Sequence, residues 1–139
     1  MTNSTDTSVA RAMGVDWSQI KFFKPHEFDS PGNPGSGEMM VPEFVAWLDL
    51  VRAKAQVPFV INSAYRTPEH NEAVGGVHNS PHMLGCAVDI AAPDSKTYFS
   101  ILEAAISCGC TRIGMGKNFI HLDLDGTKPQ GRAWTYPGV

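Results

Sequence analysis

The sequence predicts an α+β fold in which helices pack on a small antiparallel sheet. Two observations predict this class: helical patterns begin before most of the β-rich segments, and links of hairpin length join the later β-rich segments. The chain has 139 residues, of which 42% are hydrophobic and 18% are charged. This length fits one compact domain, and this composition provides enough apolar side chains for a core.

Three segments carry the signals of helices. Pro42 suits the first position of a helix, and apolar side chains then recur at helical spacing until Val57-Pro58 ends the pattern. A short helix is expected over residues 67–74, which begin with a Thr-Pro capping signal and end before two glycines. The third helix is expected over residues 96–108, because a Pro-Asp-Ser cap precedes it and a glycine follows it.

Five short segments rich in β-branched and apolar residues are predicted as strands. Two of them form a hairpin, because a tight turn at Gly116-Lys117 joins them. Residues 22–37 are rich in Pro and Gly, so we expect a long irregular loop that is either functional or held down by its aromatic side chains. The predicted strands span residues 59–63, 86–91, 111–115, 119–124 and 132–136.

The ends and the charge of the chain set limits on its partners. Residues 1–18 are expected to form a flexible tail and residues 19–139 a single domain. A net charge of −3 without a basic block gives no electrostatic support for nucleic-acid binding. No apolar run approaches the roughly 18 residues of a membrane helix, and the N-terminus lacks the hydrophobic segment of a signal peptide. We therefore expect a cytoplasmically synthesised monomer with no nucleic-acid or membrane partner.

Two histidines and one aspartate have the pattern of a metal site. His82 lies in a loop seven residues before Asp89, and a glycine between them permits the chain to fold back. His121 lies in a later strand, where alternation places it on one face with Asp123. If these two strands pair side by side, Asp89 and His121 become neighbours. Two imidazoles and one carboxylate suit a catalytic zinc ion, and also other divalent metals.

Three sequence blocks together resemble one enzyme family. The run SPHMLGCAVD, residues 80–89, resembles the S-x-H-x-x-G-x-A-x-D signature of the zinc D-alanyl-D-alanine peptidases. The upstream run SAYRTPEHN, residues 63–71, resembles the S-G-Y-R-x-x-x-x-N block of this family, and FIHLD, residues 119–123, resembles its last-ligand strand. The family includes D-Ala-D-Ala carboxypeptidases and phage L-alanyl-D-glutamate endolysins, and the Hedgehog signalling domain shares its fold. The resemblance covers roughly residues 40–136.

The resemblance implies a role for each matching residue. His82, Asp89 and His121 would hold one zinc ion. Arg66 would act in catalysis and substrate binding, because its guanidinium can bind a substrate carboxylate or the polarised carbonyl. Ser80 would donate a hydrogen bond to the substrate, and its alternative role is to stabilise a local turn. The resemblance therefore implies a zinc peptidase that hydrolyses stem peptides of bacterial peptidoglycan as a carboxypeptidase or an endopeptidase.

One position departs from the family pattern. Many members carry an acidic general base three residues before the last histidine ligand, where this chain has Asn118. An amide cannot accept a proton near neutral pH, so the base is unassigned. Asp123 is a candidate for the base and also for a structural role beside His121, and Asp125 is a second candidate for the base. The loop before the first helix offers further candidates: His26, Glu27, Asp29 and Glu38.

Because Asn118 replaces the usual acidic residue, two interpretations of the activity remain. One is an active enzyme, reaching the cell wall after release from the cytoplasm or as part of a virion. The other is a catalytically weak or inactive zinc-stabilised module of the same fold, used for binding or as a structural part. Loss of a general base would reduce the rate by about a hundred- to ten-thousand-fold without removing the metal.

Overall fold

A computed structural model describes residues 14–139 of the chain. Most of the predicted tail, residues 1–13, therefore lies outside the described residues. The chain contacts the domain before the predicted boundary at residue 19, because Val15 is buried in the core. Trp17 packs on Phe28 with its ring centroid 5.6 Å away. No helix in the described residues has both the length and the apolar character needed to cross a membrane.

The fold is α+β, as predicted, and its sheet has five strands in the order β1-β2-β4-β3-β5. The central pair, β2 and β4, is antiparallel and in continuous register over five residue pairs. Strands β1 and β3 pair antiparallel with the outer sides of β2 and β4. The strands are β1 (Ile61–Ser63), β2 (Ala87–Ala91), β3 (Arg112–Met115), β4 (Phe119–Asp123) and β5 (Arg132–Thr135).

The prediction of a wholly antiparallel sheet is wrong for one pair, because β5 runs parallel to β3. Strand β4 already has a neighbour on each side, so the chain that follows it can pair only at an edge of the sheet. It leaves β4 at the end where β3 begins, and the carbonyl of Thr111 accepts hydrogen bonds from the backbone N–H groups of Gly131 and Arg132. Strand β5 therefore starts beside the start of β3 and runs in the same direction.

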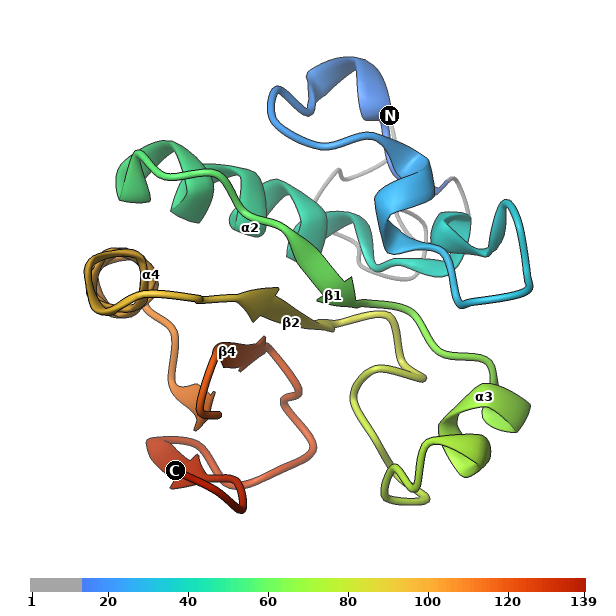
Figure 1. Cartoon of the computed structure of the whole chain (residues 1–139). Coiled ribbons are helices and arrows are strands. Elements are labelled where there is room, and N and C mark those ends of the chain that lie inside the picture. Colours follow the sequence, from blue (N-terminus) through green and yellow to red (C-terminus); the bar gives the residue numbers. More distant parts are fainter. Residues whose placement is uncertain (1–13) are drawn as a thin grey trace.

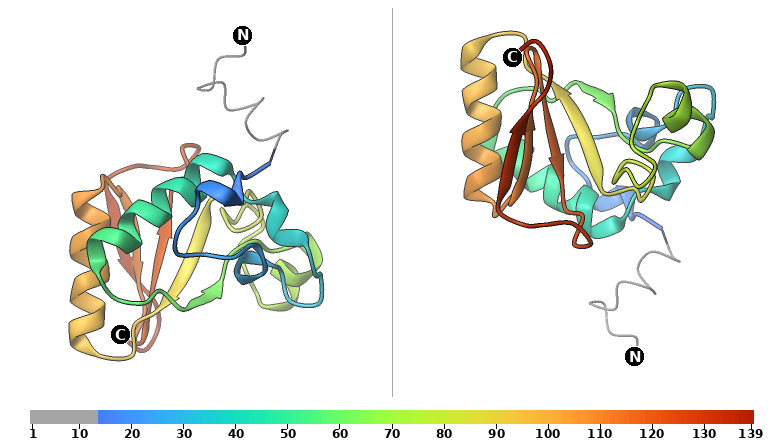
Figure 2. Two further views of the ribbon diagram at one scale, coloured as in Figure 1. Left: turned by 90° about the horizontal axis from the view of Figure 1, so that it is seen from above. Right: turned by 90° about the horizontal axis from the view of Figure 1, so that it is seen from below.

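Two long helices cover one face of the sheet (Figures 1 and 2). Helix α2 (Pro42–Ala55) packs against helix α4 (Ser95–Ser107), and α4 also contacts β4. The alternating residues of the central strands that are fully buried belong to the same hydrophobic core as the inner side of α2. The opposite face of these strands carries polar residues instead. The core residues of β2, β4 and α2 include Val88, Ile90, Ile120, Leu122, Phe44, Val45 and Leu48.

The helix caps form as the sequence predicts. The short helix α3 (Pro68–Ala73) begins after Thr67, whose hydroxyl accepts a hydrogen bond from the backbone N–H of His70. Helix α4 begins after Asp94, whose carboxylate accepts one from the N–H of Thr97. These bonds satisfy backbone donors that a helix leaves without internal partners.

The irregular segment before α2 is held down by its aromatic side chains, which was one of the two predicted alternatives. Phe23 and Phe28 are buried and meet edge to face at 5.5 Å. The carboxylate of Asp49 on α2 accepts hydrogen bonds from the backbone N–H groups of Lys21 and Phe22, each 2.9 Å long. Three short 3-10 helices lie in this part of the chain: η1 (Trp17–Gln19), η2 (Pro25–Phe28) and η3 (Ser36–Met39).

Gly85 permits the sharp path between His82 and β2, and we expect its replacement to destabilise the protein. Its φ of 76° lies in the left-handed region, and an added Cβ would collide with the backbone oxygen of Met39 and lie 3.0 Å from the Cα of Met40. Gly75 has a similar φ of 74° but open space around the position of a Cβ. Gly75→Ala should therefore cost only the conformational strain, about 1–2 kcal/mol.

Gly85→Ala should lower the free energy of unfolding by clearly more than Gly75→Ala does, because steric overlap adds to the same strain. Urea unfolding of the two variants and the parent measures both losses. Equal losses would show that the contact of Gly85 with residues 39 and 40 contributes nothing.

Candidate metal centre

His82 is held by the segment that follows β1. Its Nδ1 lies 2.7 Å from the carbonyl oxygen of Ala64, and the ring nitrogen must be the donor because a carbonyl oxygen only accepts. The backbone carbonyl of His82 accepts a hydrogen bond from the N–H of Arg66 at 3.2 Å. The imidazole is buried, and these bonds leave Nε2 as the nitrogen that faces the site.

Asp89 and His121 are directly opposite each other on β2 and β4, as the sequence predicted for paired strands. The Oδ1 atom of Asp89 lies 2.9 Å from Nδ1 of His121 and 3.3 Å from Nε2 of His82. Burial alone would raise the pKa of Asp89, but the hydrogen bonds with His121 and His82 hold it well below its usual range. Asp89 is therefore a carboxylate anion that faces both imidazoles.

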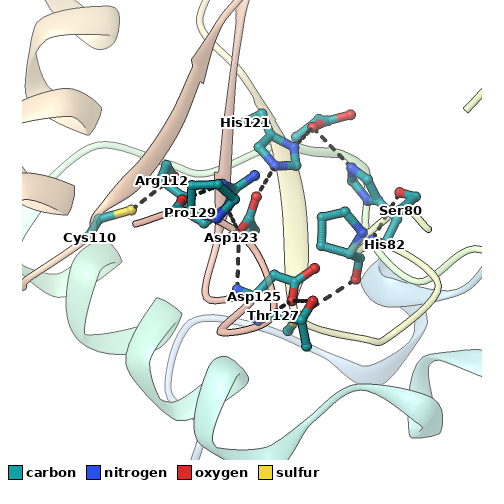
Figure 3. Close-up of polar contacts among 12 residues, drawn as sticks. Ser80, His82, Cys110, Arg112, His121, Asp123, Asp125, Thr127 and Pro129 are labelled. Carbon is teal, nitrogen blue, oxygen red and sulfur yellow. Dashed lines mark hydrogen bonds and ion pairs between the residues drawn. The ribbon is translucent and has the colours of Figure 1, made fainter. Parts of the chain in front are cut away.

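Behind His121, a buried carboxylate and a buried guanidinium fix the orientation of the ring (Figure 3). The Nε2 atom of His121 lies 2.6 Å from Oδ2 of Asp123. The Oδ1 atom of Asp123 accepts hydrogen bonds from Nε of Arg112 at 2.7 Å and from the N–H of Asp125 at 3.0 Å. Asp123 has no exposed surface. Burial would raise its pKa, but hydrogen bonds with His121, Asp125 and Arg112 lower it.

The three converging atoms fit a tetrahedrally coordinated zinc ion. One possible ligand atom from each of His82, Asp89 and His121 lies within 4.8 Å of the other two. Ligand atoms about 2.0–2.1 Å from a tetrahedral zinc ion are about 3.4 Å apart, close to the two short separations found here. Both imidazoles donate their other N–H to an oxygen, which directs the remaining lone pair inward. The site therefore has the donor set and orientation of a metal centre.

These three residues lie in a pocket of about 530 Å³ on the face of the sheet opposite α2 and α4. Arg66 lines the pocket and is held by Ser63, Asn71 and Asp89. Its Nη2 is 3.5 Å from Oδ2 of Asp89, so the guanidinium is aimed at the metal centre. Ser80 is buried at the pocket wall.

The hydroxyl of Ser80 accepts a hydrogen bond from the backbone N–H of His82 at 3.2 Å. This bond stabilises the local turn, which was one of the two roles predicted for Ser80. The hydroxyl hydrogen of Ser80 remains available for a second contact, since a hydroxyl donates one hydrogen bond and accepts two.

The other candidates for a general base lie outside this pocket. Asn118, which occupies the position of the usual base, is exposed in the turn before β4, and its backbone carbonyl accepts a hydrogen bond from the N–H of Ala92. None of the four candidates in the segment before α2 lines the pocket. Three of them have local partners instead: Glu27 bonds to Lys24, Asp29 to Gly35 and Gly37, and Glu38 to Trp17. Among the described residues, the carboxylates that line the pocket are Asp89 and Asp123.

Two pocket residues were missed by the sequence analysis. Arg112 is buried, and its guanidinium carbon lies 4.9 Å from the ring centroid of Trp134. Trp134 also packs against the ring of His121, with 5.6 Å between centroids. Counting residues outward from the predicted turn places Arg112 opposite Asp123. Opposite charges at such a pair stabilise a hairpin, so this contact could have been predicted. The position of Trp134 depends on the parallel pairing of β5, which had no local signal.

The sequence model of one known family, Peptidase M15, matches residues 13–123 and therefore most of the chain. The chain belongs to the peptidase M15 family. The resemblance to zinc D-Ala-D-Ala peptidases is thus confirmed at the level of the family, and the His82–Asp89–His121 cluster is a candidate metal site within it. The match includes both strands that carry Asp89 and His121.

Two individual proteins are similar to this M15 family member. The zinc D-Ala-D-Ala carboxypeptidase of Streptomyces albus G is 33% identical over 88 residues, which is 61% of this chain. The chain spans about a third of the length of that carboxypeptidase, since the match covers 33% of it. The crystal structure of the L-Ala D-Glu endopeptidase ChiX of Serratia marcescens aligns with a TM-score of 0.45 and 22% identity, over 61% of this chain and 80% of that one.

We expect the metal-free form of this M15 protein to lose stability as the pH rises above about 6.5. Burial lowers the pKa of His121, but the hydrogen bonds with Asp123 and Asp89 outweigh burial and raise it. A raised histidine pKa stabilises the folded state below the unfolded value of about 6.5, and this contribution is lost as the pH rises through the folded value. The lowered pKa values of Asp89 and Asp123 stabilise the protein above about pH 4, and that contribution is lost on acidification.

Thermal unfolding of chelator-treated protein between pH 5 and 8.5 measures this dependence. Added zinc should raise the melting temperature more at pH 8 than at pH 6, because a metal competes with the proton for Nδ1 of His121. A metal-free protein that became more stable between pH 6.5 and 8 would contradict the assigned contacts of His121.

Proposed function

We propose that this chain is a zinc peptidase that hydrolyses peptide bonds in the stem peptides of bacterial peptidoglycan. The observation that carries the proposal is the convergence of His82, Asp89 and His121 in a pocket that Arg66 also lines. Membership of the M15 family supports the same chemistry, and the similar Streptomyces protein is named a zinc D-Ala-D-Ala carboxypeptidase.

Different groups in the pocket would perform different parts of such a reaction. A bound zinc ion would supply a Lewis acid that polarises the scissile carbonyl and makes water a nucleophile near neutral pH. Arg66 would bind the carbonyl oxygen as it gains negative charge, because its guanidinium stays protonated and is already fixed by three side chains. Ser80 would donate the hydrogen of its hydroxyl to a polar group of the peptide.

For Asp123 we propose an orienting role and not that of the general base. Both of its oxygens are occupied, by His121 on one side and by Arg112 and the backbone of Asp125 on the other. A carboxylate that accepts hydrogen bonds from three fixed partners and has no exposed surface is poorly placed to take a proton from a water molecule in the pocket. Such a carboxylate–histidine pair raises the basicity of the metal ligand and fixes its tautomer.

Incubation of the zinc-loaded protein with defined peptides tests the proposal. The peptides carry either a D-Ala-D-Ala end or an L-Ala-D-Glu bond, and mass spectrometry identifies the products. A new product that disappears with chelator and returns with zinc is the expected result, and its mass identifies the bond. A protein that binds one zinc ion per chain but cleaves neither peptide nor intact peptidoglycan would overturn the peptidase proposal.

That second outcome would favour a different function, a zinc-stabilised binding or structural module. The observation in its favour is the exposed Asn118 at the position of the usual base, together with a pocket whose two carboxylates are both engaged. Binding of the same peptides without cleavage would support a binding module, and absence of both binding and cleavage would support a structural role.

A further inference from the structure

Three cationic side chains line the pocket, but its two carboxylates pair with only two of them. Its walls carry Arg66, Arg112 and Lys128 against the two carboxylates Asp89 and Asp123. Arg66 is paired with Asp89, and Arg112 is paired with Asp123. Within residues 14–139, Lys128 has no carboxylate at ion-pair distance.

The excess charge contrasts with the rest of the chain. The whole chain has a net charge of −3, whereas the charged side chains of the pocket sum to about +1 before any metal is added. A divalent cation at the His82–Asp89–His121 site would make the pocket more positive still. A concave site with this local excess attracts anions and raises their local concentration.

Lys128 lies in the loop between β4 and β5, and hydrogen bonds within the loop fix its backbone. The N–H of Lys128 donates to the carbonyl of Asp125 at 3.3 Å, and the side-chain amide of Gln130 donates to the carbonyl of Lys128 at 2.9 Å. The same amide also donates to the carbonyl of Asp125. Lys128 is half-buried and lines the pocket. A lysine in such a position can bury its aliphatic stem while its ammonium group stays in contact with solvent and ligands.

We propose that Lys128 binds a free carboxylate on the substrate residue that follows the cleaved bond. This inference rests on the proposed function and names the substrate class of the same site. A D-Ala-D-Ala end carries its terminal carboxylate on that residue. A D-Glu that is linked onward through its side chain carries its α-carboxylate there. The two substrates therefore share one chemical group beside the leaving nitrogen, and one ammonium group can recognise either.

Arg66 is a poorer candidate for this contact than Lys128, because the proposed function already assigns its remaining donors to the carbonyl oxygen of the cleaved bond. Its Nε, Nη1 and Nη2 atoms already donate to Ser63, Asn71 and Asp89. The guanidinium of Arg112 is engaged by Asp123 and by the carbonyl of Pro129. Within residues 14–139 the ammonium group of Lys128 has no hydrogen-bond or ion-pair partner, which leaves its three donors for a ligand. Its flexible stem can follow a carboxylate at more than one position.

Paired peptides with a free carboxylate or a carboxamide on the residue after the cleaved bond test the proposal. One pair contains D-Ala-D-Ala and the other contains L-Ala-D-Glu, so the two sources of the carboxylate are separated. The variants are Lys128→Gln, Lys128→Arg and, as a matched control, Lys117→Gln. Lys117 is exposed in the turn between β3 and β4 and does not line this pocket.

For the peptide that the parent cleaves, Lys128→Gln should raise KM for the free acid about tenfold and leave kcat within about twofold. KM for the matching carboxamide peptide should not change. The preference of the parent for the free-acid peptide should therefore disappear. Lys128→Arg should restore most of the preference, and Lys117→Gln should behave as the parent does. Equal losses on acid and amide, or an unchanged preference, would overturn the role of Lys128.

A binding measurement keeps this test separate from the test of the peptidase itself. Chelator-treated protein is titrated with the acid and amide peptides, and NMR shifts report binding. Tighter binding of the acid that Lys128→Gln removes would support the proposal even if no peptide is cleaved. Equal binding of acid and amide by the parent would overturn it, whatever the outcome for activity.

Discussion

His82→Ala is expected to abolish zinc binding and to reduce peptide cleavage by about a thousandfold or more. The substitution removes one of three ligands, and a catalytic metal contributes several kcal/mol to stabilisation of the transition state. It also leaves the carbonyl of Ala64 without its 2.7 Å partner, which should cost about 1–3 kcal/mol of stability. Metal content after dialysis, the shift in melting temperature on zinc addition, and the rate of cleavage are the three measurements.

His78→Ala provides the matched control for this prediction. His78 lies four residues before His82 in the same segment but is exposed and outside the metal cluster. The His78→Ala protein should bind one zinc ion, be stabilised by zinc as the parent is, and cleave the peptide at the parent rate. Zinc bound by His82→Ala with parent affinity would show that the metal site lies elsewhere.

The elements that local chemistry specifies were predicted well. Thr67 and Asp94 cap the helices that follow them, and Gly85 adopts the left-handed conformation that lets the chain turn into β2. Each of these features depends on a few adjacent residues, so the sequence contains the whole signal. The direction of β5 is different, because it depends on which edge of the sheet remains open after β4 has gained two neighbours.

The same distinction applies to the metal centre. Strand alternation placed His121 and Asp123 on one face, and the pairing of β2 with β4 brought Asp89 opposite His121. The contacts that orient the ligands could not be predicted in this way. His82 is held by Ala64 through a loop, and Trp134 reaches His121 only through the parallel strand β5. Long-range packing, which has no periodic signature, determines these contacts.

Asp123→Ala is expected to destabilise the protein by about 3–5 kcal/mol, because it leaves the charge of Arg112 buried without its partner. Asp123→Asn is the more informative substitution, since it preserves the shape and retains an oxygen for Arg112. Its amide nitrogen would face Nε2 of His121, where a hydrogen-bond donor meets a donor. The imidazole would then favour a proton on Nδ1, the atom that faces the metal site.

This change of tautomer separates the two roles considered for Asp123. If Asp123 orients His121, Asp123→Asn should weaken zinc binding about ten- to a hundredfold, and excess zinc should restore much of the activity. If Asp123 were the general base, zinc affinity would stay near that of the parent while kcat fell about a hundred- to ten-thousandfold at saturating zinc. Zinc titrations followed by rates at saturation distinguish these outcomes. The engagement of both carboxylate oxygens by fixed partners leads us to expect the first.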